Sequence, residues 1–265
     1  MKLFNRDVKF RQVPGKALAL SRMFFSSFKF QSPTELWKGY LGRVAPSDNR
    51  LDLRDGTKIF LSSNPHDSVT VMVNFCRNEY GKIHRDWSVI DIGANIGVFM
   101  LVAARSGAGH VYCFEPNTEA FDVLGKNIME NALSDRVTAT KAAVTGQADQ
   151  SVYVPKASSP YNQAVSTAIG QDVEFEAVES ITLSDIIEAY GLADVDLLKL
   201  DCEGAEYEIL LETPGDVLKK IRKIRMELHP SRRHPRAEVL DRLHELGFAC
   251  VRHSGMIYWF KRAED

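Results

Sequence analysis

Residues 89 to 97, Val-Ile-Asp-Ile-Gly-Ala-Asn-Ile-Gly, constrain the fold of this chain more than any other stretch. An apolar run contains the carboxylate of Asp91, and a turn with Gly93 and Gly97 follows it at once. Glycine permits the tight turn at the first position and a close approach to a strand or ligand at the second. Residues 98 to 104 then continue as an apolar helix-forming segment. The pattern predicts the strand–turn–helix unit of a doubly wound α/β fold.

The spacing of the glycines indicates which ligand such a turn would hold. Dinucleotide-binding turns carry Gly-x-Gly-x-x-Gly, whose amides hold a pyrophosphate, whereas this turn carries Gly-x-x-x-Gly behind an acidic residue. A carboxylate there repels a pyrophosphate and attracts a ligand with an ammonium and a sulfonium group. We therefore expect S-adenosylmethionine to be bound by Asp91, Gly93, Ala94, Asn95 and Gly97. The alternative is an ordinary turn of an α/β protein that binds nothing.

A second acidic position supports the same cofactor. Residues 110 to 114 form a predicted strand, which is followed by Glu115, Pro116 and Asn117. Doubly wound folds hold ribose hydroxyls with an acidic residue about twenty positions after the glycine turn. An acid at a helix N-terminus beside proline gives the same pattern, and the two interpretations are compatible. We expect adenine to pack on small residues near the end of the third predicted strand, which are Ala142, Ala143 and Val144.

The remainder of the chain alternates apolar runs with amphipathic segments, which predicts a mostly parallel sheet with helices on both faces. Strands are expected near 87–92, 110–115, 136–142, 195–201, 222–228, 247–252 and 256–261. Helices are expected at 96–106, 118–131, 182–190, 203–212 and 235–246. Only His253, Ser254 and Gly255 separate the last two strands, so the final strand must run antiparallel. Seven strands with an antiparallel last strand indicate the Rossmann-like methyltransferase fold rather than the all-parallel sheet of most dehydrogenases.

Two further segments frame this core. Residues 1–85 are predicted to form an extension in front of a domain at 86–265, and to cover its cofactor side. The extension should contain a hairpin at 50–61 and a helix that begins near Pro65. Its first part carries Ala17, Leu20, Phe24 and Phe28 at helical spacing, which predicts a helix packed on its own domain. A homodimer contact and a membrane-surface helix are the alternatives. Residues 146–180 form an insertion with strand-like runs at 152–155 and 173–178, which would shape a substrate pocket.

Composition narrows the function classes. The chain has 265 residues and a net charge of −2, which argues against a long nucleic-acid partner. It has no apolar stretch of the ~20 residues that a transmembrane helix needs. The four cysteines, Cys76, Cys113, Cys202 and Cys250, are scattered without metal-binding spacing. They indicate reduced thiols in a cytoplasmic protein.

Acidic residues and one histidine follow the predicted fourth and fifth strands. Asp201 and Glu203 come after residues 195–200, and Glu227 and His229 end the next strand. Because parallel strands of a doubly wound sheet bind ligands beyond their carboxyl ends, these side chains are expected to share one site. Glu206 is expected to be only a first-turn acid of the following helix.

These motifs resemble the FkbM family of S-adenosylmethionine-dependent methyltransferases over about residues 65–265. The resemblance rests on Asp-Ile-Gly-Ala-Asn-Ile-Gly at 91–97, Phe-Glu-Pro at 114–116, Lys-Leu-Asp-Cys-Glu-Gly-Ala-Glu at 199–206 and Glu-Leu-His at 227–229. Cys202 stands where the family more often has Val or Ile. The resemblance implies methyl transfer, mostly to oxygen, on sugars, glycolipids, polysaccharides or secondary metabolites.

The chemistry suggests roles for Asp201, Glu227 and His229. A hydroxyl acceptor needs a base or a metal that lowers its pKa, and histidine ordinarily titrates near neutral pH. His229 is therefore the expected general base, while Asp201 and Glu227 are the expected ligands if a divalent cation such as Mg²⁺ takes part. A carboxylate acceptor would need neither.

Rival functions make different demands on the sequence. The missing Gly-x-Gly-x-x-Gly and the presence of Asp91 argue against a nicotinamide-dependent oxidoreductase. The intact acids at each strand end argue against an inactive methyltransferase-like binding module. A nucleic-acid methyltransferase is opposed by the charge and by the missing Asn-Pro-Pro-aromatic motif. Arg232, Arg233 and Arg236 follow His229 closely, so an anionic small-molecule or glycan acceptor is expected to meet them.

Overall fold

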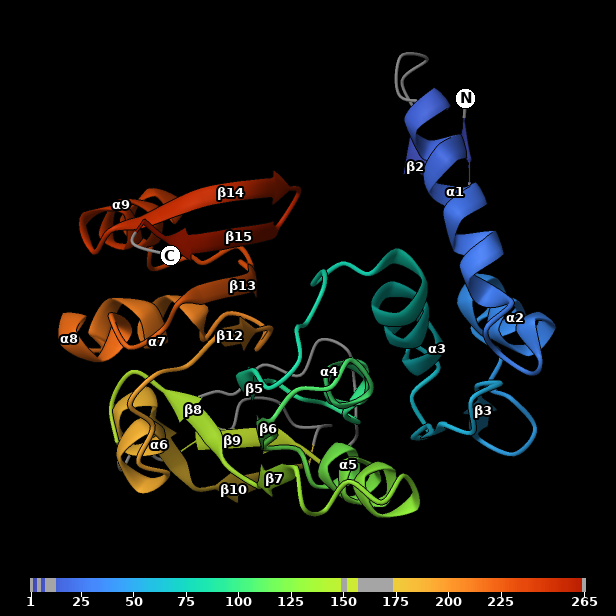
Figure 1. Cartoon of the computed structure of the whole chain (residues 1–265), viewed down its shortest axis with the longest axis horizontal. Coiled ribbons are helices and arrows are strands. Elements are labelled where there is room, and N and C mark those ends of the chain that lie inside the picture. Colours follow the sequence, from blue (N-terminus) through green and yellow to red (C-terminus); the bar gives the residue numbers. More distant parts are fainter. Residues whose placement is uncertain (1, 4–5, 8–12, 149–151, 157–173, 264–265) are drawn as a thin grey trace.

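The structure, a computed structural model of the chain, describes residues 2–3, 6–7, 13–148, 152–156 and 174–263, with side chains from Leu20 onward. A seven-stranded sheet in the order β14-β15-β13-β12-β5-β6-β7 forms its centre (Figure 1). These strands are β5 (Ser88–Ile92), β6 (His110–Phe114), β7 (Val137–Thr140), β12 (Leu197–Leu200), β13 (Lys223–Glu227), β14 (Phe248–Ser254) and β15 (Ile257–Arg262). The neighbouring strands β13, β12, β5, β6 and β7 are parallel to one another, and β15 is antiparallel to both β13 and β14. The predicted Rossmann-like methyltransferase fold with an antiparallel last strand is confirmed.

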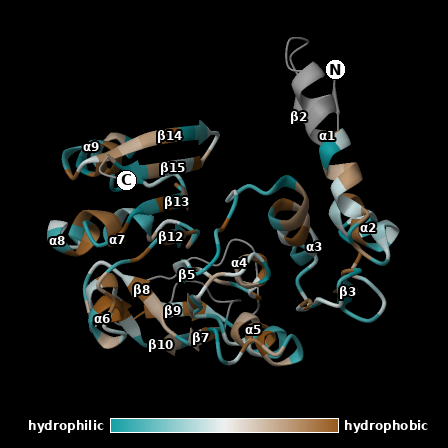
Figure 2. Ribbon diagram, in the orientation of Figure 1, coloured by the Kyte–Doolittle hydropathy of each residue, from teal (hydrophilic) through white to brown (hydrophobic). Residues whose placement is uncertain are grey.

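Helices cover both faces of the sheet. One face carries α4 (Val98–Arg105) and α5 (Thr118–Glu130), and the other carries α6 (Leu183–Ala189), α7 (Glu206–Glu212), α8 (Gly215–Leu218) and α9 (Arg236–Glu245). Successive side chains of β5 point to opposite faces, so Val89 packs in one hydrophobic cluster and Ile90 in the other. Both residues are fully buried. Figure 2 shows α5 and α6 with hydrophobic and hydrophilic residues side by side, as expected for helices with one buried face.

The N-terminal extension packs against the α4 and α5 side. It comprises β1 (Lys2–Leu3), β2 (Arg6–Asp7), α1 (Val13–Ser27), α2 (Pro33–Gly42), β3 (Arg50–Asp52), β4 (Lys58–Phe60), α3 (Asp67–Val71) and the π-helical segment η2 (Met72–Arg77). The predicted hairpin is present as β3 and β4, whereas α2 was not expected. The Asn127 side chain accepts a hydrogen bond from the Phe60 amide and donates to the Phe60 and Ile96 carbonyls. The extension and the sheet share one hydrophobic cluster, so the division at residue 85 stays a prediction.

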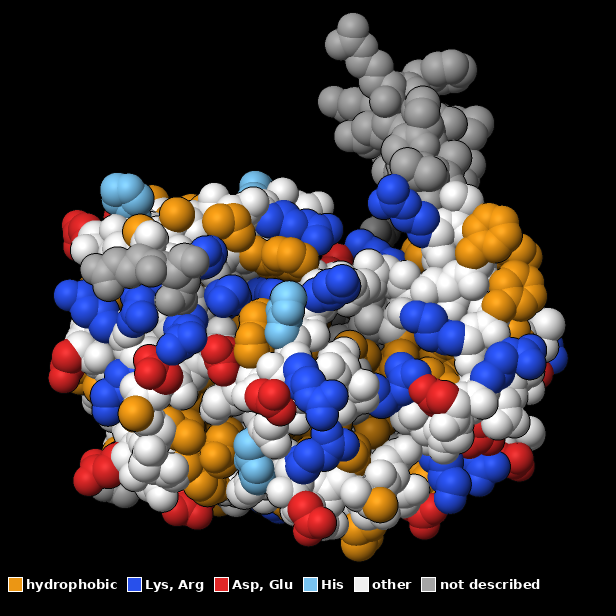
Figure 3. Space-filling view, viewed as in Figure 1, with side chains coloured by type: hydrophobic (Ala, Val, Ile, Leu, Met, Phe, Trp, Pro, Cys, Tyr) orange, Lys and Arg blue, Asp and Glu red, His pale blue; other side chains and the backbone are white. Residues whose placement is uncertain are grey.

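The predicted packing of α1 is wrong in its register. Phe24 and Phe28 are 49% and 48% exposed, and Phe25 is 72% exposed, whereas Met23 and Ser27 are buried. Leu20, Met23 and Ser27 also follow helical spacing. Met23 and Leu20 pack in the hydrophobic cluster that the extension shares with the sheet, and Ser27 accepts a hydrogen bond from the Trp37 indole of α2. The side chain of Ala17 lies outside the described part of the chain. Hydrophobic side chains are visible on this side of the molecule in Figure 3.

Two elements begin or end at residues other than those predicted, and each difference has a local cause. The third strand, β7, ends at Thr140, and Ala143–Thr145 form a separate strand, β8, paired with β11 (Ser180–Thr182). The helix expected from residue 203 begins only at Glu206, because Glu203 and Gly204 have φ angles of 55° and 115° that a helix cannot contain.

The expected insertion contains a short antiparallel pair. β9 (Val152–Pro155) matches the first strand-like run. β10 (Phe175–Val178) covers the second from residue 175 onward and pairs with β9, while Glu174 is outside the strand and Val173 lies outside the described residues. None of the helices in the described ranges has the length and apolar character needed to cross a membrane.

Candidate active site

A cavity of about 430 Å³ opens at the carboxyl ends of the central parallel strands. This volume lies in the usual range for small-molecule sites. The ends of β5, β6, β12 and β13 supply one part of its wall, and η2 supplies another. The cavity therefore lies where a doubly wound sheet is expected to bind its ligand.

The glycine turn after β5 forms the floor of the cavity. Gly93 has a φ of 74°, and a Cβ atom there would lie 1.9 Å from the Asp201 carbonyl oxygen. The amides of Gly93 and Ala94 both donate to the Phe114 carbonyl, at 3.0 and 3.1 Å. Gly93, Ala94 and Asn95 line the cavity, whereas Gly97 instead packs its backbone against the Leu124 side chain. The absence of a side chain at Gly93 thus lets the turn after β5 pack closely against the end of β12.

Asp91 lies beneath this turn and does not line the cavity. Its carboxylate is fully buried, and its Oδ1 is 2.9 Å from the Nζ of Lys199. The same Nζ donates a 2.8 Å hydrogen bond to the Gly93 carbonyl and lies 3.9 Å from Asp201 Oδ2. Burial raises the pKa of Asp91 and Lys199 counteracts it. Direct contact between Asp91 and a cofactor, as the sequence predicted, therefore has no support in this geometry.

Glu115 lines the cavity at the end of β6 and is 8% exposed. Its two carboxylate oxygens accept hydrogen bonds from the Asn95 and Asn117 amides, at 2.8 and 2.9 Å. Burial raises its pKa to about 7, although both backbone hydrogen bonds favour the ionised form. The carboxylate thus fixes the glycine turn and keeps lone pairs for ligand hydroxyls. Pro116, Asn117, Ala142, Ala143 and Val144, which the sequence predicts to contact the cofactor, also line the cavity.

Asp201, Glu203 and Glu227 form an acidic wall beside the glycine turn. Tyr80 donates a 2.8 Å hydrogen bond from its hydroxyl to Asp201 Oδ2, which fixes one oxygen of that carboxylate. Glu203 has a left-handed backbone with a φ of 55°, a conformation that costs energy for a non-glycine residue and is often found at functional sites. Burial raises the pKa of Glu203 and of Glu227 to about 7, and repulsion from Asp201 adds to it.

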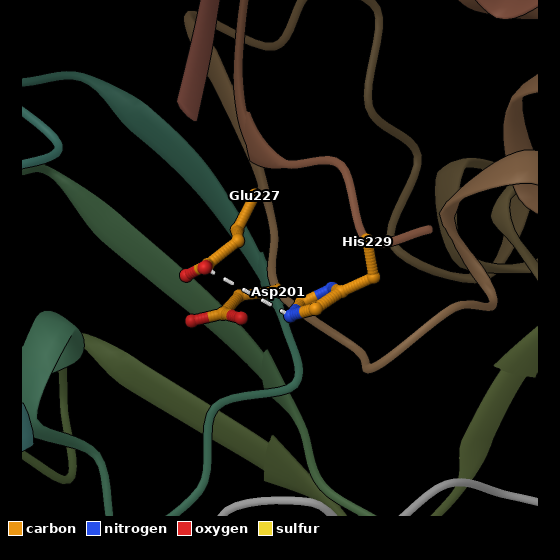
Figure 4. A group of neighbouring side chains, drawn as sticks. All are labelled: Asp201, Glu227 and His229. Carbon is orange, nitrogen blue, oxygen red and sulfur yellow. Dashed lines mark ion pairs between the residues drawn. The ribbon is translucent and has the colours of Figure 1, made fainter. Parts of the chain in front are cut away.

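His229 lies behind this wall rather than in it. Its Nδ1 is 2.9 Å from Glu206 Oε1, and its Nε2 is 3.5 Å from Glu203 Oε2 and 4.0 Å from Glu227 Oε1. Figure 4 shows the side chains of Asp201, Glu227 and His229 pointing toward one another. Burial lowers the pKa of the imidazole, but the hydrogen bond to Glu206 and the acidic neighbours raise it to about 9. A protonated imidazole cannot accept a proton, so the expected base role requires that this proton first be displaced.

Glu206 does more than the sequence indicated. Its side chain is fully buried and accepts hydrogen bonds from the Cys202 and Gly204 amides, both at 2.9 Å, as well as contacting His229. It therefore joins the loop after β12 to the loop after β13. Sequence reasoning also missed Tyr80 and Lys199; the spacing of Lys199 two residues before Asp201 was the available signal for a side chain on the same strand face.

The three arginines expected to meet an anionic acceptor do not line the cavity. Arg233 lies 3.1 Å from Glu208, and Arg236 contacts the Tyr258 hydroxyl at 3.3 Å. The cavity wall instead contains Arg77 of η2, which lies 2.9 Å from Glu79. The position of the arginines near His229 in sequence was misleading, because β13 ends at Glu227 and the chain then turns away from the cavity.

Comparison with known proteins identifies the family of this chain. The family model for the methyltransferase FkbM domain matches residues 91–250, which include the glycine turn and the whole acidic wall. The chain belongs to the FkbM methyltransferase family. It is therefore an S-adenosylmethionine-dependent methyltransferase with a Rossmann-like fold.

Relatives of this FkbM-family protein include two curated enzymes. Methyltransferase sdnD of Sordaria araneosa is 29% identical over 197 residues, covering 62% of this chain and 74% of that protein. The 31-O-demethyl-FK506 methyltransferase FkbM of Streptomyces tacrolimicus is 27% identical over 168 residues, covering 53% of this chain and 65% of that protein. A solved methyltransferase FkbM from Methylobacillus flagellatus is 12% identical with a TM-score of 0.44, covering 94% of this chain and 59% of that one.

Proposed function

We propose that this enzyme transfers the methyl group of S-adenosylmethionine to a hydroxyl oxygen of a sugar, glycan or secondary-metabolite acceptor. The observation that carries the proposal is that the acidic wall and the glycine turn line the same cavity. The name of the Streptomyces relative, a 31-O-demethyl-FK506 methyltransferase, supports transfer to oxygen.

The residues of the cavity fit this cofactor. Gly93 has no side chain, so the turn that lines the cavity can pack directly against the Asp201 carbonyl, and Glu115 offers a buried carboxylate for the ribose hydroxyls. The backbone and small side chains at Ala142, Ala143 and Val144 supply the adenine wall. Gly97 and Asp91 support the turn from behind, with Lys199 joining Asp91 to the Gly93 carbonyl.

The acidic wall serves the acceptor. When bound, the cofactor supplies a methyl group that is already activated on sulfur. The acceptor oxygen forms the new O–CH₃ bond as the S–CH₃ bond breaks, the bonding pair stays on sulfur, and the hydroxyl proton passes to a wall carboxylate such as Glu203. Alignment of the two reactants can contribute about 7–11 kcal/mol of the rate enhancement. Asp201 and Glu227 orient the hydroxyl, and His229 positions Glu203 and Glu227 from behind.

The extension completes the acceptor side of the cavity. Val73, Asn74 and Arg77 of η2 line it, and so does Met256 in the turn between β14 and β15. An anionic group on the acceptor would meet Arg77. A homodimer contact through α1 and a cytoplasmic location remain predictions, supported by the exposed Phe25 and by four unpaired cysteines.

Labelled methyl transfer tests the proposal. The enzyme is incubated with methyl-labelled S-adenosylmethionine and a panel of sugars, glycosides, hydroxylated macrolides and small carboxylic acids, and the labelled atom is located by NMR. The proposal predicts label on a hydroxyl oxygen. Label on nitrogen, carbon or a carboxylate oxygen would overturn it while leaving the methyltransferase assignment intact.

The Mg²⁺ expected from the sequence belongs to the same proposal, since a cation beside Asp201 and Glu227 would lower the pKa of the acceptor hydroxyl.

A further inference from the structure

We infer that Asp201, Glu227 and His229 form a divalent-cation site of defined composition, with one oxygen from each carboxylate and Nε2 of the imidazole as ligands. Its role, which rests on the proposed function, is to hold the acceptor oxygen next to the transferred methyl group. One imidazole and two carboxylates suit Mn²⁺ or Mg²⁺ better than the soft metals that thiolates select.

The ligand atoms are close enough to converge on one ion. The three candidate atoms all lie within 4.8 Å of one another. An octahedral ion at 2.0–2.1 Å from its ligands holds adjacent donor atoms about 3 Å apart, so modest side-chain rotations complete the site. Asp201 and Glu227 follow neighbouring parallel strands, β12 and β13, and these strands fix the spacing of their backbones. Figure 4 shows that the three side chains already point to a common centre.

Glu206 prepares the histidine for this role. Histidine ligands commonly donate their second ring nitrogen to a carboxylate, which fixes the tautomer and the ring orientation. Here Nδ1 of His229 lies 2.9 Å from the fully buried Glu206, and Nε2 therefore faces the carboxylates. The side chain of His229 is only 11% exposed, so a ligand reaching Nε2 comes from the side of the acidic wall.

The local charge also favours a cation. Within the described residues, Glu203 and Glu227 form ion pairs only with His229, at 3.5 and 4.0 Å. Asp201 lies 3.9 Å from Lys199, which pairs closely with Asp91. These distances are long for ion pairs in a partly buried site, so the negative charge of the wall is incompletely balanced. Lys199 cannot balance it further, because its Nζ is already held by Asp91 and the Gly93 carbonyl.

Manganese binding tests the inference without using methyl transfer. Free Mn²⁺ is measured by electron paramagnetic resonance while MnCl₂ is titrated into the full chain. We expect one saturable site, weakened at least tenfold in His229→Ala and in Glu227→Gln. The matched control is Glu79→Gln, which removes a carboxylate from the same cavity wall but not from the ligand set; it should change the affinity by less than about threefold.

Other outcomes contradict the inference. No saturable Mn²⁺ binding by the wild-type protein would overturn it, and equal weakening by Glu79→Gln and Glu227→Gln would show diffuse attraction instead of ligation. If His229→Ala does not fold, the near-isosteric Glu227→Gln variant alone tests the inference. A second readout is thermal denaturation: Mn²⁺ should raise the melting temperature of the wild-type protein but not that of Glu227→Gln. Titration of S-adenosylmethionine into the same samples separates the claims. Cofactor binding without Mn²⁺ binding defeats only the cation site, and Mn²⁺ binding without cofactor binding defeats the proposed function.

Discussion

His229 Nδ1 lies 2.9 Å from Oε1 of Glu206, a carboxylate without solvent exposure. Glu206 also accepts two backbone amides from the loop after β12. One side chain therefore sets both the conformation of the loop that presents Asp201 and Glu203 and the orientation of the imidazole after β13. The geometry of the acidic wall depends on this buried charge.

Replacing Glu206 by Ala should destabilise the protein by about 3 kcal/mol, because it leaves two amides and a buried imidazole without their acceptor. Chemical denaturation measures the change. Glu208→Ala is the control on the same helix; it removes a partly exposed pair with Arg233 and should cost less than about 1 kcal/mol. Equal losses in the two variants would contradict the role of Glu206.

Gly93→Ala should lower the affinity for S-adenosylmethionine at least tenfold and also destabilise the fold. The added Cβ atom would lie 1.9 Å from the Asp201 carbonyl oxygen at a φ of 74°, so the turn or β12 must move. The control is Gly125→Ala in α5, where a Cβ atom meets nothing within 4 Å; it should stabilise the protein slightly. Calorimetric titration and thermal denaturation provide both readouts, and unchanged cofactor affinity in Gly93→Ala would refute the placement of the cofactor.

The affinity for S-adenosylmethionine should depend on pH through Glu115. Its pKa of about 7 in the free enzyme means that the carboxyl is ionised above pH 7 and protonated below it. Ribose hydroxyls donate to the ionised form, so bound cofactor lowers this pKa. The affinity is therefore full above about pH 7 and falls as the pH drops, approaching about tenfold per pH unit.

Titrations between about pH 5 and pH 8 measure this dependence, and Glu115→Gln is the comparison because its side chain does not titrate. The variant should bind more weakly at pH 8 and show a flatter profile. A wild-type profile that is flat through pH 7, or one that Glu115→Gln leaves unchanged, would exclude Glu115 as the ribose ligand.

His229→Ala should reduce turnover by roughly 10²–10⁴-fold, the range for impaired general-base catalysis, because the wall carboxylates that orient and deprotonate the acceptor lose the imidazole that positions them. The cofactor affinity should stay nearly unchanged. His229 lies behind the acidic wall and does not line the cavity, so cofactor contacts stay intact. His234→Ala is the matched control, since His234 pairs with Glu238 outside the cavity. A fully active His229→Ala enzyme would show that alignment of the reactants suffices.

The sequence predicted those parts of the fold that depend on local pattern. The alternation of apolar runs and amphipathic segments predicted the parallel strands of the sheet. The three-residue link between β14 and β15 predicted the antiparallel last strand, because so short a link cannot form a parallel crossover. Glu115 and the wall residues were found because strand ends of a parallel sheet meet at one edge.

What the sequence missed depends on contacts between distant segments. Asp91 looked like a cofactor ligand until Lys199, more than one hundred residues later, was seen to pair with it beneath the turn. Glu206 looked like a simple helix-start acid because its partner His229 comes from another strand. Two helical registers of α1 fit the same sequence, so Phe24 and Phe28 were assigned to the buried face. In the structure Met23 and Ser27 are buried instead.

Calorimetric titration of S-adenosylmethionine into the full chain, with NAD as the rival ligand, tests the central claim most directly. The account predicts saturable one-to-one binding of S-adenosylmethionine that Glu115→Gln weakens, and no binding of NAD at the same concentrations. Binding of NAD in preference to S-adenosylmethionine, or S-adenosylmethionine binding that is indifferent to Glu115, would contradict it.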